Sequence, residues 1–258
     1  MSRRRSILLA ALCLPVADGT RFLIVRHGET NHNALGIIQG SSDVSRLTDR
    51  GVNQARVAGY ALASLDDVSI NRVFVSSLTR ARQTLDTIEK AFSTALPQAT
   101  VLADLREIDL GSWESRDKAD LTKEHPDMYA AWKRDPLKFY VDEERPVVNL
   151  WARAADAWAI MREQPKEQPD RGTATGGESI GPVTLVVTHN ACGQALLCTS
   201  LGLDETHYRQ FEFGNCAALE IDWPHDAKRA RAYRWRIGPK MASLVRWPSG
   251  SEPPWVEC

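Results

Sequence analysis

Short apolar runs alternate with longer amphipathic segments along this chain. Four runs have the length and character of buried strands, at 22–25, 73–75, 101–102 and 185–188. Three segments keep one apolar face at helical spacing: the stretch that follows Thr48, a predicted N-cap, and the stretches 81–92 and 150–161. Alternating strands and helices predict a three-layer α/β/α fold, in which helices cover both faces of a mostly parallel central sheet.

The remaining segments add to this single domain, which we place at 21–240. Residues 217–221 and 232–237 predict a terminal β-hairpin. Residues 109–146 are polar and aromatic by turns without a strand signal, and they predict a helical insertion over the sheet and its active site. Residues 164–182 are rich in Pro, Gly, Thr and charge, which is typical of a flexible surface loop.

Both ends of the chain lie outside the predicted domain. Residues 1–20 contain three arginines at 3–5 before an apolar run at 7–14, a pattern typical of a cleavable targeting signal and too short to span a bilayer. The pair of arginines also resembles a twin-arginine signal, and a disordered start is the alternative. Residues 241–258 are predicted to form a C-terminal tail.

Composition narrows the function classes. The chain has 258 residues and a formal net charge of −1, which does not favour nucleic-acid binding. Five cysteines, an odd number without a C-x-x-C spacing, argue against a disulfide framework. Cys192 and Cys198 lie in an apolar helical pattern and are expected to be buried thiols. No cluster of His, Cys and carboxylates has metal-ligand spacing, so no metal is expected.

Reactive side chains follow each of the four predicted parallel strands. Arg26 and His27 follow the first strand, and Ser76, Ser77 and Arg80 follow the second. Arg106 and Glu107 come after the third strand, and His189 comes directly after the fourth. Ligands of parallel α/β sheets bind beyond the carboxyl ends of the strands, so these side chains are expected to converge.

This set of residues suits a phosphoryl group. Arginine forks bind its oxygens in pairs and stay charged at any working pH. A neutral imidazole can attack phosphorus and form a covalent intermediate, and a carboxylic acid can protonate the departing alkoxide. Each residue alone is weak evidence, because a single histidine or arginine is more often structural. Their joint placement at strand ends predicts a phosphate pocket with a nitrogen nucleophile.

Five motif blocks carry a resemblance to a known family. They are 23–30 with Asn33, 39–55 with Gln39, Gly40, Asp43 and Gly51, then 76–84, 105–111 and 186–190. Together they resemble the histidine phosphatase (phosphoglycerate mutase-like) superfamily over about residues 21–222. The resemblance implies that His27 is the nucleophile and Glu107 the proton donor, and that His189 completes the catalytic set. It implies substrate binding by Arg26, Asn33, Arg80, Gln39, Gly40 and Asn190, with no metal and no cofactor.

A narrower likeness concerns the plant and algal 2-carboxy-D-arabinitol-1-phosphatases. It rests on 132–136, 146–147, 150–154, 194–197 and 201–203, and on Asn190 followed by Ala191. The likeness implies a phosphomonoesterase that acts on a small sugar or sugar-acid phosphate through a phosphohistidine. The alternatives are a phosphoglycerate mutase and a relative that binds phosphorylated ligands without catalysis. The branch implies a plastid location, with a secretory or cytoplasmic location as alternatives, although the presequence is short for a transit peptide.

The predicted partner is thus a small phosphorylated molecule, without nucleic acid or stable membrane association, and the sequence indicates no oligomeric state. Six cations of the insertion could bind a substrate carboxylate: Arg116, Lys118, Lys123, Lys133, Arg134 and Lys138. Most of them are expected to lie on a solvated charged face instead.

Overall fold

The computed structural model describes residues 19–163 and 183–237. Its centre is a six-stranded sheet in the order β3-β2-β4-β1-β5-β6. The strands are β1 (Gly19–Arg26), β2 (Ile70–Ser76), β3 (Thr100–Leu102), β4 (Val183–Thr188), β5 (Ala218–Pro224) and β6 (Ala232–Ile237). Strands β1 to β4 pair in parallel, whereas β5 runs antiparallel to both β1 and β6. The predicted parallel strands and the terminal hairpin are both confirmed.

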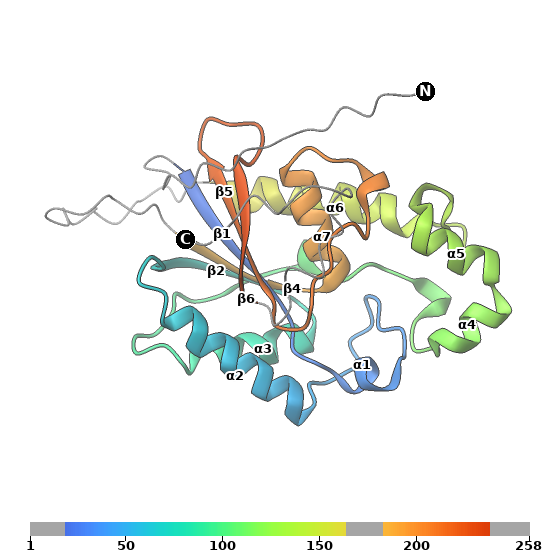
Figure 1. Cartoon of the computed structure of the whole chain (residues 1–258), viewed down its shortest axis with the longest axis horizontal. Coiled ribbons are helices and arrows are strands. Elements are labelled where there is room, and N and C mark those ends of the chain that lie inside the picture. Colours follow the sequence, from blue (N-terminus) through green and yellow to red (C-terminus); the bar gives the residue numbers. More distant parts are fainter. Residues whose placement is uncertain (1–18, 164–182, 238–258) are drawn as a thin grey trace, which may run out of the picture.

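Helices cover both faces of this sheet. One face carries α2 (Asp49–Ala63) and α3 (Thr79–Glu89), and the other carries α6 (Pro146–Arg162) and α7 (Asn190–Ser200) (Figure 1). Successive side chains of β1 point to opposite faces, as in any strand. Leu23 and Val25 join the core cluster on the α2 and α3 side, whereas Phe22 and Ile24 join the cluster that contains α6 and α7. The predicted three-layer arrangement is therefore confirmed.

Local chemistry sets the ends of several helices. The Thr48 hydroxyl accepts a hydrogen bond from the Gly51 N–H at 3.0 Å, which satisfies a free donor in the first turn of α2. Pro146 occupies the first turn of α6, where its missing N–H costs no helical hydrogen bond. The shorter elements are α1 (Asn31–Leu35), η1 (Ala103–Leu105) and η4 (Glu205–His207).

The insertion between β3 and α6 is helical, as predicted. It contains η2 (Gly111–Trp113), α4 (Lys118–Glu124), α5 (Pro126–Arg134) and η3 (Pro136–Lys138). Its helices lie beside the end of the sheet where α1 is found (Figure 1). An aromatic cluster holds it together, with the ring of Phe139 5.3 Å from that of Trp113 and 5.7 Å from that of Trp132. These rings belong to the same core cluster as Phe22 and Ile24 of β1, so the insertion shares the core of the domain.

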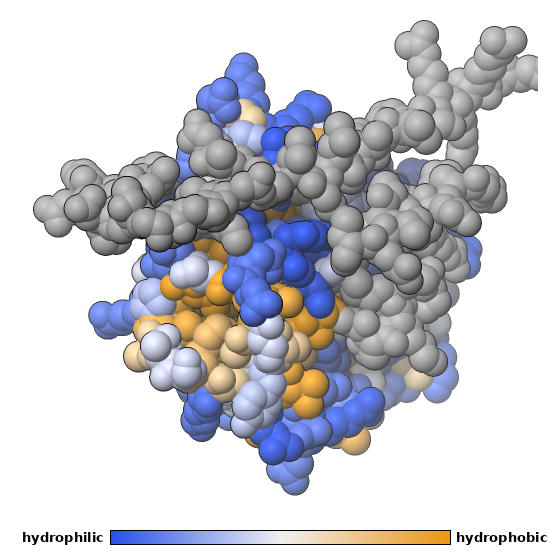
Figure 2. All heavy atoms as spheres, turned by 60° about the vertical axis from the view of Figure 1, so that its left-hand side comes forward, coloured by the Kyte–Doolittle hydropathy of each residue, from blue (hydrophilic) through white to orange (hydrophobic). Residues whose placement is uncertain are grey.

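The surface is hydrophilic over much of the face in Figure 2, where apolar side chains gather in one area. Within residues 19–163 and 183–237 no helix is long and apolar enough to cross a membrane. The thiols of Cys192 and Cys198 are buried and free, as expected, and so is that of Cys216. The predicted loop 164–182 and tail 241–258 lie outside the described residues, as does the predicted N-terminal segment except for residues 19 and 20 of β1.

Candidate functional site

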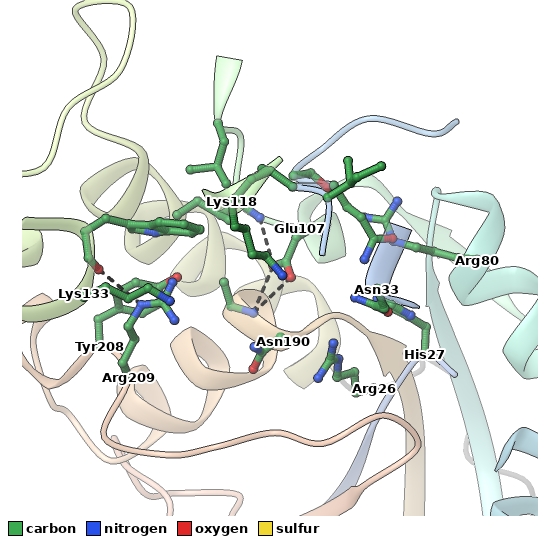
Figure 3. A pocket seen from close by; sticks show the side chains of 18 residues that line it. Arg26, His27, Asn33, Arg80, Glu107, Lys118, Lys133, Asn190, Tyr208 and Arg209 are labelled. Atoms are coloured by element: carbon green, nitrogen blue, oxygen red, sulfur yellow. Dashed lines mark hydrogen bonds between the residues drawn. The ribbon is translucent and has the colours of Figure 1, made fainter. Parts of the chain in front are cut away.

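A cavity of about 270 Å³ opens where the carboxyl ends of the strands meet the insertion. Its wall contains all but one of the predicted site residues: Arg26, His27, Asn33, Gln39, Gly40, Arg80, Glu107 and Asn190. His189 is the exception. The insertion and the segment before β5 add further lining residues, among them Trp132 and the labelled Lys118, Lys133, Tyr208 and Arg209 (Figure 3). The cavity therefore joins the predicted phosphate pocket to a second group of cations.

His27 directly follows β1 and is only 2% exposed. Its Nδ1 lies 2.7 Å from the carbonyl oxygen of Gly28, which can only accept a hydrogen bond. The neutral tautomer with its proton on Nδ1 satisfies this contact and leaves the Nε2 lone pair free. Burial, together with the positive charges of Arg26 and Arg80, lowers the pKa of His27 well below its usual value. The imidazole is therefore neutral at physiological pH.

Two glycines allow the turn that presents His27 to pack against α2: Gly28 in the turn and Gly51 in the helix. A Cβ added to Gly28 would lie 2.4 Å from the carbonyl oxygen of Gly51, and a Cβ on Gly51 would lie 2.0 Å from that of Glu29. The backbone after β1 thus packs directly against the first turn of α2. Only glycine permits this close approach, which explains why both positions belong to the motif.

The buried Arg80 and the partly buried Arg26 flank the imidazole. The Nη1 and Nη2 atoms of Arg80 donate to the carbonyl oxygens of Ser42 and Gly40, both at 2.7 Å, and the Nη1 of Arg26 donates to that of Phe213 at 2.6 Å. The Nε of each arginine is buried without a hydrogen-bond partner. Buried donors are normally paired, so these unpaired N–H groups suit an incoming anion. Burial lowers the pKa of Arg80 to about 10, and the side chain still carries its charge at neutral pH.

His189 lies behind His27 instead of on the cavity wall. It is fully buried, and the two imidazole rings have centroids 5.1 Å apart. Its Nε2 lies 2.7 Å from the Oγ of Ser76, while its Nδ1 is buried without a partner. Burial and nearby positive charges, that of Arg80 first among them, lower the pKa of His189 well below its usual value. The structure thus brings the two predicted histidines together as a neutral pair.

Glu107 stands at the start of α7. Its Oε1 accepts hydrogen bonds from the N–H groups of Ala191 at 3.0 Å, Cys192 at 3.1 Å and Ile108 at 3.0 Å. The first N–H groups of a helix lack partners within the helix, and a carboxylate is a good acceptor for them. In Figure 3, Glu107 lies between the side with His27 and Arg80 and the side with Lys133 and Arg209. A carboxyl in this place can exchange a proton with a group bound beside His27.

The three predicted amide side chains of the wall are each held by hydrogen bonds to neighbouring residues. Asn33 completes a capping box with Thr30 at the start of α1, and its Oδ1 also accepts from the amide of Asn215 at 3.4 Å. The Gln39 Oε1 accepts from the Thr30 hydroxyl at 2.9 Å, so its amide group is held in place. The Asn190 Oδ1 accepts from Gln194 at 2.9 Å, so this residue is oriented from within α7.

Of the six predicted cations, only Lys118 and Lys133 line the cavity. Three others form ion pairs elsewhere on the insertion: Arg116 with Glu124, Lys123 with Asp120, and Lys138 with Asp135. Arg134 is exposed and is not part of the wall. The solvated charged face expected for most of these residues is thus observed.

Arg209 also lines the cavity, although it is not among the residues predicted from the sequence. It has a left-handed backbone with φ at 66°, an unusual conformation for arginine. Its guanidinium lies over the rings of Trp132, at 4.5 Å, and Tyr208, at 4.9 Å, and its Nε donates to the Trp132 carbonyl oxygen at 3.2 Å. No motif block contains this residue, and no periodic pattern surrounds it. Its contact with Trp132 spans 77 positions, so only folding reveals it.

Within the described ranges, no group of three or more His, Cys, Asp or Glu side chains could hold a metal ion. The cavity offers the neutral imidazole of His27 with that of His189 behind it, the guanidiniums of Arg26 and Arg80 with their unpaired Nε donors, a carboxyl and three further cations. This chemistry suits binding and transfer of a phosphoryl group.

Comparisons with known proteins agree with this geometry. The family model described as "Histidine phosphatase superfamily (branch 1)" matches residues 22–236. The chain is 36% identical to the "2-carboxy-D-arabinitol-1-phosphatase" of Triticum aestivum over 209 residues, which are 81% of this chain and 38% of that protein. It is 32% identical to the "Probable phosphoglycerate mutase GpmB" of Citrobacter koseri over 204 residues, which are 78% of this chain and 83% of that protein.

A solved structure supports the same fold. The "Alpha-ribazole Phosphatase from Shigella flexneri" is 27% identical, with a TM-score of 0.64 over 81% of this chain and 93% of that one. The chain spans less than half the length of the Triticum aestivum relative.

Proposed function

Because the chain belongs to the histidine phosphatase superfamily, we propose that it hydrolyses phosphate monoesters through a phosphohistidine on His27. One observation carries this proposal. His27 is neutral, its Nδ1 is engaged by the Gly28 carbonyl, and its Nε2 is left free at the cavity. The buried, unpaired Nε donors of Arg26 and Arg80 lie around it and suit the phosphate oxygens.

The proposed reaction has two steps. In the first, the Nε2 of His27 attacks phosphorus, the ester P–O bond breaks, and Glu107 gives its proton to the leaving alkoxide oxygen. In the second, a water oxygen attacks phosphorus while Glu107 takes a proton from that water, the P–N bond to the Nε2 of His27 breaks, and inorganic phosphate leaves with the imidazole neutral again. The guanidinium charges of Arg26 and Arg80 stabilise the negative charge on the transferring group in both steps.

The experiment that tests this proposal traps the intermediate. Wild-type protein mixed with a ³²P-labelled ester should retain acid-labile, base-stable phosphate on His27, located by mass spectrometry, and His27→Ala should retain none and lose turnover. His32→Ala is the matched control, because this neighbouring imidazole does not line the cavity. A phosphoserine in place of the phosphohistidine would refute the proposal.

A second test addresses Glu107. An alkoxide needs a proton as it leaves, whereas the p-nitrophenolate of p-nitrophenyl phosphate is already a stable anion. Glu107→Gln keeps the Oε1 that accepts the three N–H groups and removes the acidic proton. Proton donation typically contributes about 10²–10⁴-fold, so we expect roughly that loss on sugar phosphates and much less on the aryl ester. Equal losses would show that Glu107 only supports the phosphate site.

For the substrate, we propose a sugar-acid phosphate such as 2-carboxy-D-arabinitol 1-phosphate. Lys118, Lys133 and Arg209 line the same cavity, and no carboxylate of the described chain forms an ion pair with any of them. Arg209 is also held in an unusual backbone conformation, which is typical of functional positions. A substrate with a carboxylate away from its phosphate would neutralise these charges. The name of the Triticum aestivum relative supports the same substrate class.

Matched substrate pairs test the need for a carboxylate. We expect higher kcat/KM for 6-phosphogluconate than for glucose 6-phosphate, and for 3-phosphoglycerate than for glycerol 3-phosphate. Arg209→Met should reduce this preference without changing the rate on p-nitrophenyl phosphate. Lys138→Met is the control, since Lys138 is paired with Asp135 away from the cavity. Equal rates within each pair would refute the substrate class and leave the phosphatase proposal standing.

Phosphoglycerate mutase activity is the alternative, favoured by the Citrobacter koseri relative and by cations that suit the phosphoglycerate carboxylate. Assays that follow isomerisation and release of inorganic phosphate in one reaction separate the two activities. A binding protein without catalysis is a weaker alternative, because His27, Arg26 and Arg80 are all present in the cavity wall. A plastid location remains a further proposal, supported by similarity to the Triticum aestivum protein and tested by a fluorescent fusion of the full chain.

A further inference from the structure

Arg153 contacts the segment that carries Glu107 without touching the Glu107 side chain. It lies on α6, and its Nη2 donates to the carbonyl oxygens of Arg106 and Glu107, both at 2.8 Å. In the described part of the chain no other group donates to these two carbonyls. A single guanidinium nitrogen therefore fixes two successive peptide groups beside the cavity.

Other contacts fix the same segment from different elements. The hydroxyl of Thr188, at the end of β4, donates to the Leu105 carbonyl oxygen at 2.8 Å. The first N–H groups of α7 hold the Glu107 carboxyl itself. Arg153 binds the same segment from α6, through the two carbonyls that follow Leu105. Without it, the segment would keep the Thr188 contact, the bond from the Arg106 N–H to the Ala103 carbonyl oxygen and the contacts of the Glu107 carboxyl, but the carbonyls of residues 106 and 107 would lose their donor.

Arg153 has no ion-pair partner among the described residues, and its Nε is buried without a hydrogen-bond partner. A half-buried arginine that serves only to hold main-chain carbonyls is costly, because its charge is partly removed from water. Its positive charge also lies close enough to contribute to the lowered pKa of His189. Its location therefore ties it to the reacting groups and not merely to the packing of α6.

We propose that Arg153 is a positioning residue for Glu107. By holding the carbonyls of residues 106 and 107, it sets where the Glu107 carboxyl stands relative to the leaving oxygen. This inference rests on the proposed role of Glu107 as proton donor. It goes beyond that role, because a residue outside the cavity wall would determine how well the Glu107 carboxyl is placed for proton transfer.

The expected effect follows from geometry. Displacing a reacting group by about 1 Å can cost roughly 10²-fold in rate. Arg153→Met removes the donors and keeps an unbranched apolar stem. We expect it to slow single-turnover cleavage of an alkyl phosphate by about 10–10²-fold, and to change cleavage of p-nitrophenyl phosphate by less than about 3-fold.

A double-mutant cycle with Glu107→Gln supplies the decisive measurement. If Arg153 acts through the Glu107 proton, adding Arg153→Met to Glu107→Gln should cause no further loss on the alkyl phosphate. Arg162→Met is the matched control. Arg162 lies on the same helix and its Nη2 also donates to two carbonyls, those of His225 at 3.4 Å and Ala227 at 3.0 Å, away from the cavity. Arg162→Met should not slow cleavage of the alkyl phosphate more than cleavage of p-nitrophenyl phosphate.

Several outcomes would overturn the inference. Equal losses on the two substrates would show that Arg153 acts on the phosphate site, through His189 for example. Multiplied losses in the double variant would show independence from Glu107, and a selective loss in Arg162→Met would show a general effect of α6.

If Arg153→Met does not fold, Arg153→Lys applies the same test, with a smaller selective loss expected. If Glu107→Gln loses as much activity on p-nitrophenyl phosphate as on the alkyl phosphate, the proton-donor role and this inference fail together. A selective Glu107→Gln with an unselective Arg153 variant overturns the inference alone.

Discussion

Replacing Arg80 with lysine separates a guanidinium clamp from a simple positive charge. Arg80 is fully buried, and its two terminal nitrogens are already committed to the carbonyl oxygens of Ser42 and Gly40 at 2.7 Å. Its Nε has no partner in the protein. The planar fork therefore holds the scaffold with two nitrogens while keeping another donor for a bound phosphate. Lysine has one nitrogen at the end of its chain and cannot make all three contacts.

The magnitude follows from the contacts that are lost. At least one of the two buried carbonyls loses its donor, which costs about 1–3 kcal/mol of stability. For a chain of this size the loss lowers Tm by roughly 2–4 °C per kcal/mol. Losing one donor to the transferring group typically costs about 10²–10³-fold in kcat, or about 2.7–4 kcal/mol. The rate loss should be similar for alkyl and aryl phosphates, because Arg80 would contact the phosphoryl group that both share.

The assay measures single-turnover rates on p-nitrophenyl phosphate and on a sugar phosphate, together with Tm. Arg82→Lys is the control, since Arg82 lies two positions along the same helix, is exposed, and contacts only the Thr79 hydroxyl at 3.4 Å. An Arg80→Lys variant with a rate within about 3-fold of wild type would refute the assignment, because removal of a transition-state donor costs far more.

Three further predictions concern ionisation and metals. NMR of the imidazole nitrogens should show His27 neutral to well below pH 6.5, because burial and flanking arginines lower its pKa; a normal titration would contradict this. The side chain of Lys133 is exposed as a whole, but its ammonium group is partly removed from solvent. This desolvation, together with the nearby charges of Arg209 and Lys118, lowers the pKa of Lys133 to about 8. Its charge is lost as pH rises through that value, so kcat/KM for a carboxylated substrate should fall between pH 7 and 9 in wild type but not in Lys133→Met. EDTA should leave activity unchanged, and loss restored by a divalent ion would overturn this expectation.

Stability should also depend on a carboxyl remote from the site, that of Asp67. Burial would raise the pKa of Asp67, but its hydrogen bonds to Arg236 and Arg21 outweigh burial and lower it. A lowered pKa means that stability is present above the ordinary value of 3.8 and is lost as pH falls through the folded-state value. Asp67→Asn should be less stable than wild type at pH 7 by about 1–2 kcal/mol in urea melts, with the difference shrinking in acid. A difference independent of pH would contradict the charge argument.

The sequence by itself determined the layers of the fold and the phosphate side of the cavity. A helix that packs on one face leaves a period in its apolar positions, and a strand buried on both faces leaves a continuous apolar run. Residues 22–25 form such a run, with Leu23 and Val25 in the core on one face of the sheet and Phe22 and Ile24 in the core on the other. The residues around His27 could be predicted from their motif, and the structure adds the reason for its glycines, because Gly28 and Gly51 lie where a Cβ would meet neighbouring backbone. The family itself could be identified from these short blocks, and the match over residues 22–236 confirms it.

The tertiary structure alone decided which cations reach the cavity and where the second histidine lies. Lys118 and Arg116 are two positions apart, yet one lines the cavity while the other pairs with Glu124, and composition cannot distinguish them. Arg209 meets Trp132 across 77 positions, and Arg153 meets Glu107 across 46. Such contacts leave no periodic trace in the chain, because they depend on how the insertion, α6 and the segment before β5 pack together. Local patterns therefore predict the site of phosphoryl transfer, whereas selectivity and positioning depend on long-range packing.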